Sequence, residues 1–297
     1  MQLDKVIVAG IAIIAVLAII LFISGACAAC LFLGNVSNNV GNAYPVEHRE
    51  DKTVHAAAPN VDLDVTTIGG KVEIVDSTDG NIEVIYDVFA SPGHLDDVRT
   101  GTNYSQSGDT LKIRAEAKIP DIDRLVNIVV TRGANVIVKL PKDTRVNLNL
   151  NTLGGDIVVP ERNGGRMELN SMGGKIRING GVYETIKATT AGGDIDARYG
   201  ATYATFETMG GGIYLDANQT TGSLKASTAG GDIDVTLPDG TLFTIDASTM
   251  GGRVRHGYIP MDATTENDRR LVGKTEAGPG TLDIELSTMG GNVEIGY

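Results

Sequence analysis

The residues with the clearest capacity for chemistry are two aspartate pairs, Asp194 with Asp196 and Asp232 with Asp234, in two copies of the sequence AGGDID. Aspartates two positions apart on a strand lie on one face, where their carboxylates could bind Ca²⁺. Calcium-binding nonapeptide repeats place a further glycine in Gly-Gly-x-Gly-x-Asp, and neither copy has it. We therefore interpret these aspartates as an outward acidic ladder and expect no metal-binding residues.

Glycoside hydrolysis is the second chemistry that these carboxylates could perform. Hydrolases hold two carboxylates about 5–10 Å apart, and Asp194 and Asp232 would lie about 9–10 Å apart if two strand spacings separate them. However, Gly212 and Tyr214 fall between them, and the chain has no Trp and 5 Phe, which leaves little aromatic surface for sugar stacking. We expect no catalytic residues, and a carbohydrate-active enzyme remains the second alternative.

Other motifs of catalysis or cofactor binding are incomplete, so no cofactor is expected. The tripeptide GKT in LVGKTE (271–276) lacks the upstream glycine of a phosphate-binding loop and is interpreted as a surface loop. Arg269 and Arg270 are interpreted as a solvated pair in a loop. The four histidines are scattered, and none lies beside Ser or Cys in a nucleophile motif: His48, His55, His94 and His256.

Charge and composition exclude several classes of protein. The chain has 297 residues, with 25 Lys+Arg, 37 Asp+Glu and a net charge of −12. This charge argues against nucleic acid as a partner, because phosphate neutralisation needs clustered basic residues. The 2 cysteines cannot form a disulfide scaffold or a four-thiolate zinc site. A hydrophobic content of 42% is enough for a packed core.

Residues 1–34 are expected to anchor the protein in a lipid bilayer. Residues 6–33 run for 28 positions without a charge, whereas a membrane-spanning helix needs about 20. A cleaved signal peptide and a lipoprotein modified at Cys27 remain alternatives. Lys5 is the only basic residue before the span, so the positive-inside rule favours a single-pass cell-membrane protein with an extracellular C-terminal domain. Three N-x-S/T triplets fit an exported chain: Asn35, Asn103 and Asn218.

A β-repeat pattern recurs from residue 61 to residue 297, after a predicted flexible linker at residues 35–60. In each copy, apolar and polar residues alternate before and after a Gly-Gly pair, which predicts a strand, a corner and a second strand. In the regular part, residues 148–297, the pairs from Gly154 to Gly251 recur every 18–21 residues. The eight copies are 63–74, 148–159, 167–178, 186–197, 204–215, 224–235, 245–256 and 284–295.

A unit of about 19 residues cannot bury its apolar face alone, so the copies are expected to stack. The predicted fold is all-β: a β-solenoid-like stack of strand–GlyGly–strand repeats, preceded by one transmembrane helix. The irregular part, residues 61–147, is interpreted as a cap with a long hairpin. The final copy ends two residues before Tyr297, so we expect a poorly covered C-terminal edge.

Three expectations concern the Gly-Gly corners. The glycines are expected to allow positive φ and a tight turn. The residue before the pair alternates between large and small, for example Met172, Ala191 and Met209, which predicts that this column fills the interior. The residue after the pair alternates in charge, for example Lys175 and Asp194, which predicts attractive pairs between neighbouring strands.

Several segments resemble a widespread prokaryotic family known as “putative adhesins”. They are VDLDVTTIGGKVEIV (61–75), GDTLKIRAE (108–116) and VIVKLPKDTRVNLNLNTLGGDIVV (136–159). The resemblance covers about residues 61–297. It implies a β-solenoid-like body with a surface role and no agreed catalytic residues. The regular Gly-Gly pair is a departure, because relatives often have a single glycine there.

These observations favour a membrane-anchored, externally displayed β-repeat protein with a non-catalytic structural or adhesive role at the cell envelope. Its expected partners are the lipid bilayer, through residues 6–33, and a cell-surface glycan or protein ligand. The alternative is a cytoplasm-facing envelope-stress or scaffold component that forms a homo-oligomer through its solenoid ends. Protease access to intact cells would separate the two.

Overall fold

A computed structural model describes residues 46–120, 132–257, 259–275 and 281–297, all within one compact unit, Val46–Tyr297. These residues are nearly all β, as expected: 21 strands join in one mixed sheet, beside a single 3₁₀ turn, η1 (Leu95–Asp97). The strands are β1 (Glu47–His55), β2 (Asn60–Thr67), β3 (Val72–Asp76), β4 (Ile82–Ala90), β5 (Arg99–Ser107), β6 (Thr110–Lys118), β7 (Arg132–Leu140), β8 (Arg145–Thr152), β9 (Ile157–Val159), β10 (Arg166–Ser171), β11 (Ile176–Thr190), β12 (Ile195–Thr208), β13 (Ile213–Ala217), β14 (Gly222–Thr228), β15 (Ile233–Thr236), β16 (Phe243–Thr249), β17 (Val254–His256), β18 (Asp262–Asn267), β19 (Arg270–Lys274), β20 (Leu282–Thr288) and β21 (Val293–Gly296).

The structure tests only part of what the sequence predicts for the N-terminal region. No helix among the described residues is long and apolar enough to cross a membrane, and the predicted span at residues 6–33 lies outside those residues. The predicted linker at residues 35–60 is wrong over Glu47–His55, which form β1 and pair antiparallel with β4. The sequence of this segment lacks the alternation of apolar and polar residues that predicts a strand, because β1 is an edge strand whose inward side chains are polar.

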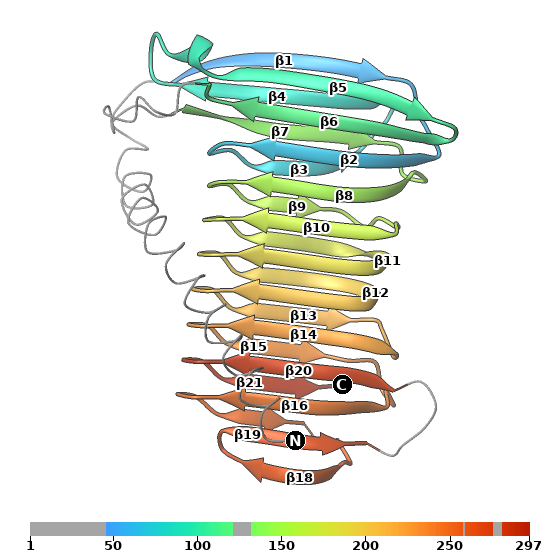
Figure 1. The fold of residues 1–297 in the computed structure, drawn as a ribbon, viewed down its shortest axis with the longest axis vertical. Helices are drawn as coiled ribbons and strands as arrows, with labels where there is room; N and C mark the ends of the chain where they lie inside the picture. Colours follow the sequence, from blue (N-terminus) through green and yellow to red (C-terminus); the bar gives the residue numbers. More distant parts are fainter. Residues whose placement is uncertain (1–45, 121–131, 258, 276–280) are drawn as a thin grey trace, which may run out of the picture. The chain divides into compact units, whose positions relative to one another are not determined.

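The repeats stack in two ladders, with one strand of each copy in each ladder (Figure 1). Leu148, Met167 and Ile186, which hold the same place in three successive copies, are direct neighbours on parallel strands. This register confirms the repeat that the sequence predicts. The pre-glycine ladder has the spatial order β6, β2, β8, β10, β11, β12, β14, β20, β16. The post-glycine ladder has the order β7, β3, β9, β11, β12, β13, β15, β21, β17.

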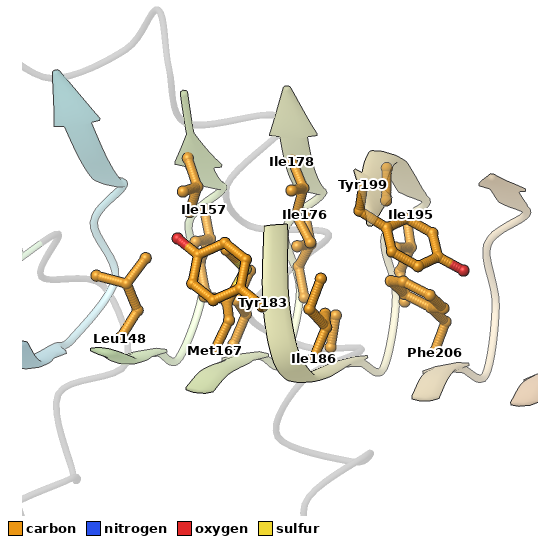
Figure 2. Close-up of a cluster of buried hydrophobic side chains, with 14 of the residues drawn as sticks. Leu148, Ile157, Met167, Ile176, Ile178, Tyr183, Ile186, Ile195, Tyr199 and Phe206 are labelled. Carbon is orange, nitrogen blue, oxygen red and sulfur yellow. The ribbon is translucent and has the colours of Figure 1, made fainter. Parts of the chain in front are cut away.

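An apolar column fills the space between the two ladders (Figure 2). In the close-up, Leu148, Met167 and Phe206 come from the pre-glycine strands, and Ile157 and Ile195 come from the post-glycine strands. Alternation along each strand places every second side chain in this column. Most inward positions expected from the alternation are at most 1% exposed, among them Met167, Leu169, Ile176, Ile178, Ile186, Ala188, Ile195, Phe206, Ile213 and Ile233. Ala204, Ile245 and Leu215 are 2–4% exposed, and Val254, in the last layer, is only partly buried.

Antiparallel strands close the N-terminal end of the stack. Strands β1 and β4 extend one ladder beyond β7, and β5 extends the other beyond β6. Polar side chains of β1 and β5 meet inside this end: Thr100 donates to Asp51 at 2.6 Å, and Tyr104 donates to Thr53 at 2.8 Å. A polar inner layer ends the apolar column and makes the edge strands poor templates for further pairing.

The last two copies stack in an order that differs from their order in the chain. Strand β20 lies between β14 and β16, and β21 lies between β15 and β17, so the final copy is sandwiched between its two predecessors (Figure 1). The expected poorly covered edge after Tyr297 is therefore wrong. The true end of the stack is β16 and β17, and the β18–β19 hairpin covers β16 through antiparallel pairing.

Close stacking, rather than positive φ, explains the second glycine of each pair. Among the glycine pairs of the eight copies, Gly69 alone has positive φ, at 73°, so the sequence expectation is wrong for the others. A Cβ on Gly174, Gly193 or Gly211 would lie 2.1 Å from the carbonyl oxygen of the second glycine one layer before. Any side chain at these positions would force neighbouring layers apart.

A buried hydroxyl two residues before each glycine pair links successive layers. We call this set the hydroxyl ladder. Each hydroxyl donates to a backbone carbonyl of the preceding layer at 2.5–2.9 Å. In most copies it also accepts the N–H of its own second glycine, so this buried N–H has a partner without water. Its members are Thr67, Thr152, Ser171, Thr190, Thr208, Thr228, Thr249 and Thr288.

The residue immediately before each glycine pair points outward, contrary to expectation. Met250 is 70% exposed, Met289 57%, Leu153 48% and Met209 39%. The reason is strand alternation: the hydroxyl residue takes the inward place, so the next side chain must face solvent. The alternation of large and small residues in this column therefore has no role in filling the interior.

Candidate functional site

A polar groove of about 700 Å³ lies on the outer face of the pre-glycine ladder, near the capped end. It crosses five neighbouring strands: β5, β6, β2, β8 and β10. Because the inward face of each strand is committed to the apolar column, the charged and amide side chains of these strands must face out. The lining residues are Asp62, Leu63, Asp64, Asn103, Tyr104, Ser105, Lys112, Ile113, Arg114, Asn147, Leu148, Asn149, Arg166 and Glu168.

Two rows of side chains run across these strands. The first row includes Ser105, Lys112, Asp62 and Asn147, each opposite the next on an adjacent strand. The second row is Asn103, Arg114, Asp64, Asn149 and Glu168, paired in the same way. The topology thus gathers segments that are up to about a hundred positions apart in the sequence onto one surface.

Hydrogen bonds hold these rows in place. Arg114 contacts Asp64 at 3.2 Å, and the amide of Asn149 donates to the same carboxylate at 3.3 Å. Asn147 donates to Asp62 at 2.8 Å and accepts the backbone N–H of Arg166 at 3.0 Å. Side chains that are already positioned in this way lose little conformational entropy when a ligand binds.

The groove offers carboxylate acceptors, amide groups that both donate and accept, and cationic donors. Such a mixture suits a ligand rich in hydroxyl groups. Aromatic stacking contributes little, because Tyr104, the single aromatic lining residue, is half-buried and stacks on His55 with ring centroids 4.7 Å apart. Lys112 makes no ion pair among the described residues and has a free ammonium group for a ligand.

The aspartates singled out in the sequence lie on the opposite, post-glycine side of the stack. Asp194 accepts from Lys175 at 2.6 Å and from the N–H of Gly212 at 3.0 Å, and these bonds lower the pKa of its carboxyl. Asp232 accepts the N–H of Asn292 at 2.6 Å. These carboxylates therefore stabilise neighbouring corners, and Lys175–Asp194 is the attractive pair that the charge alternation predicts.

The outer members of the two pairs are separated by a tyrosine. Tyr214 lies between Asp196 and Asp234 across the parallel strands β12, β13 and β15. Burial, followed by repulsion from Glu294 on the next strand, raises the pKa of Asp234. Within the described residues, no group of three or more His, Cys, Asp or Glu side chains has the arrangement of a metal site.

The histidines remain apart in the structure, each with local partners. His48 contacts Asp87 at 2.9 Å, His94 contacts Asp97 at 2.7 Å, and His256 contacts Glu266 at 3.3 Å. Among the other residues weighed in the sequence, Tyr183 is buried, Tyr203 and Tyr214 are exposed, and Arg270 pairs with Asp246 at 2.9 Å. The GKT tripeptide reaches into β19, and its Gly273 faces Ile245 of β16.

Comparison with known proteins identifies the family. The family model described as Toastrack DUF4097 matches residues 60–296, which contain both ladders and the groove. The chain belongs to the toastrack family. No curated protein matches the chain.

Several solved structures resemble this toastrack protein. A “putative cell adhesion protein” from Clostridium sporogenes is 10% identical, with a TM-score of 0.40 over 84% of this chain and 99% of the other. A “putative adhesin” from Bacteroides fragilis is 11% identical, with a TM-score of 0.33 over 84% and 97%. A “putative lipid binding protein” from Parabacteroides distasonis is 18% identical, with a TM-score of 0.38 over 86% and 98%.

Sequence reasoning missed the groove and the hydroxyl ladder. The ladder had a visible signal, since Ser or Thr precedes the glycine pair by two positions in each of the eight copies. The groove had none, because its rows exist only after β6 and β8 have taken their places on either side of β2.

Proposed function

We propose that this toastrack protein is a membrane-anchored, externally displayed β-solenoid with a non-catalytic, adhesive role at the cell envelope. Residues 6–33 would hold it in the bilayer, and the stacked body would present its outward ladders to the surroundings. The ligand we favour is a cell-surface glycan.

The polar groove is the observation that carries this proposal. Its two rows combine carboxylate, amide and guanidinium groups already fixed by mutual hydrogen bonds. Hydroxyl groups of a glycan can replace solvent on these groups. A protein ligand is less favoured, because the centre of a protein–protein interface is usually apolar and poor in charge, whereas this groove carries three acidic and three basic side chains.

Binding can be tested with the full-length protein in neutral detergent on an array of cell-surface glycans. The double variant Asp62→Ala/Asp64→Ala removes two acceptors from the groove and is expected to reduce glycan binding by about tenfold or more. The control Asp196→Ala/Asp216→Ala makes the same change in net charge on the post-glycine face, where both side chains are exposed. Equal binding by both double variants would contradict the role of the groove.

Display can be tested separately by protease treatment of intact cells. An external domain is expected to be released as a fragment that begins close to Glu47, where the described unit starts. A body that resists protease in intact cells and is cleaved after lysis would favour the cytoplasm-facing scaffold instead.

A further inference from the structure

Three arginines meet at the corner of the last layer of the stack. Arg253 and Arg255 lie on the outward side of the Gly251–Gly252 corner and β17, two positions apart. Arg269 lies in the turn between β18 and β19. All three line one hollow of about 480 Å³, whose other lining residues are Gly251, Gly252, Asp268 and Asn292.

Backbone hydrogen bonds fix the relative positions of the three arginines. The N–H of Thr249 donates to the carbonyl of Arg269 at 2.9 Å, and the N–H of Val254 donates to the carbonyl of Asp268 at 2.8 Å. The turn is therefore held against the open edge of the last layer. The N–H of Arg253 donates to Asn292 at 3.0 Å, which fixes the corner from the other side.

These arginines differ from most others because they have no carboxylate partner in the part of the chain that the structure describes. Eight arginines of the described residues make ion pairs, and only Arg99 and Arg145 share the unpaired state of this cluster. Asp268 lines the hollow, and Glu294 neighbours Arg255 across the strands, but neither lies within ion-pair distance of the three guanidinium groups. In a chain with a net charge of −12, an unpaired cluster of cations is exceptional.

We propose that this corner, which we call the arginine corner, binds phosphate oxyanions, in a lipid headgroup or in a free phosphate compound. Guanidinium groups bind phosphate through pairs of parallel, charge-assisted hydrogen bonds. The glycine pair leaves the hollow without side chains on one wall, so an anion can approach the backbone closely. This site is separate from the polar groove and does not depend on the glycan-binding proposal.

The test uses the full-length protein in neutral detergent, with inorganic tripolyphosphate as the probe in isothermal titration calorimetry. Binding is expected for the wild type and is expected to weaken about tenfold or more in Arg253→Gln/Arg255→Gln/Arg269→Gln. The control Arg177→Gln/Arg198→Gln/Arg270→Gln removes three exposed arginines that already have carboxylate partners. Because both triple variants change the net charge equally, the control is expected to retain wild-type affinity.

Two further arms sharpen the test. If micelles doped with phosphatidylglycerol compete with tripolyphosphate for the protein, the site is assigned to a lipid headgroup. If tripolyphosphate stays bound in the presence of these micelles, the site is assigned to a free phosphate compound. The single variants Arg253→Gln and Arg255→Gln are each expected to weaken binding about threefold, which guards against misfolding of the triple variant. Equal loss of affinity in the control, or wild-type affinity in the arginine-corner variant, would overturn the proposal.

Discussion

Removal of one hydroxyl from the hydroxyl ladder, by Thr190→Val, is expected to lower the free energy of unfolding by about 2–4 kcal/mol. Thr190 is 2% exposed. Its Oγ1 donates to the carbonyl of Gly174 at 2.8 Å and accepts the N–H of Gly193 at 3.4 Å. Valine has nearly the same shape as threonine, so the packing is preserved and the loss is confined to these two bonds.

The magnitude follows from the groups left behind. A buried backbone group that loses its partner costs about 1–3 kcal/mol, and both Gly174 and Gly193 are buried. The bond from Gly193 is long, so its loss is expected at the low end of that range. The carbonyl of Gly174, with the shorter bond, accounts for most of the expected destabilisation.

The adjacent residue provides a matched control. Thr189 belongs to the same strand, and its Oγ1 is buried without a hydrogen-bond partner among the described residues. Thr189→Val therefore removes an unsatisfied hydroxyl and is expected to change the stability by less than about 0.5 kcal/mol, or to raise it slightly.

The two variants can be compared by equilibrium urea unfolding of the full-length protein in neutral detergent, followed by circular dichroism. The quantity of interest is the difference between their midpoints at a common slope, since a stacked repeat need not unfold in two states. Coincident midpoints would refute the claim that hydroxyl-to-carbonyl bonds between layers stabilise the stack.

Three further predictions concern the same body. Gly211→Ala is expected to destabilise the stack by more than about 3 kcal/mol or to prevent folding, because the new Cβ would lie 2.1 Å from a carbonyl oxygen. Gly210→Ala is the control, since the atom nearest to its Cβ is 3.5 Å away, and thermal melting of the two variants checks the difference. Ile195→Asp places a charge in the apolar column, where Ile195 is 0% exposed, so limited proteolysis is expected to cleave nearby segments faster than in the wild type. Ion pairs with Lys52 at 2.7 Å and Lys139 at 3.0 Å lower the pKa of the Glu83 carboxyl. Its stabilising contribution is therefore present above the unfolded pKa of about 4.3 and is lost as the pH falls through the lower folded value. Glu83→Gln should flatten the pH dependence of unfolding in this acidic window, and an unchanged profile would count against the two ion pairs.

Alternation and glycine spacing were sufficient to predict the repeat and its core. Many inward residues, such as Ile195 and Phe206, are marked in the sequence by polar neighbours on both sides. The period places equivalent residues of successive copies opposite each other without further information. These features are local or regular, and a single sequence carries them.

Two errors arose at the corner itself. The sequence interpretation puts Met209 in the interior, whereas Thr208 occupies the inward position and Met209 faces solvent, as strand alternation requires. The sequence interpretation also explains the glycines by positive φ, whereas Gly211 is required because a Cβ there would lie 2.1 Å from a carbonyl oxygen of the preceding layer. Distances between layers decide this second point, and sequence spacing does not reveal them.

Stacking order and the polar groove could not be read from the sequence. The last two copies share the same motif, STMGG, so either could follow the copy that ends with β15. The groove likewise depends on β2 pairing with both β6 and β8, from segments up to 85 positions away. Such long-range neighbours are fixed by the complete set of strand pairings.

The order of the final layers is the most direct test of the stacked architecture. In a chain whose Cys27 and Cys30 are replaced by serine, Ser227→Cys/Ser287→Cys should form a disulfide on oxidation. These residues face each other on adjacent strands, within the reach of about 4.4–6.8 Å between Cα atoms. Ser227→Cys/Ser248→Cys should not form one, because Ser287 lies between them and two strand spacings span about 9.6 Å. A disulfide in the second pair and none in the first, read on a non-reducing gel, would contradict the architecture.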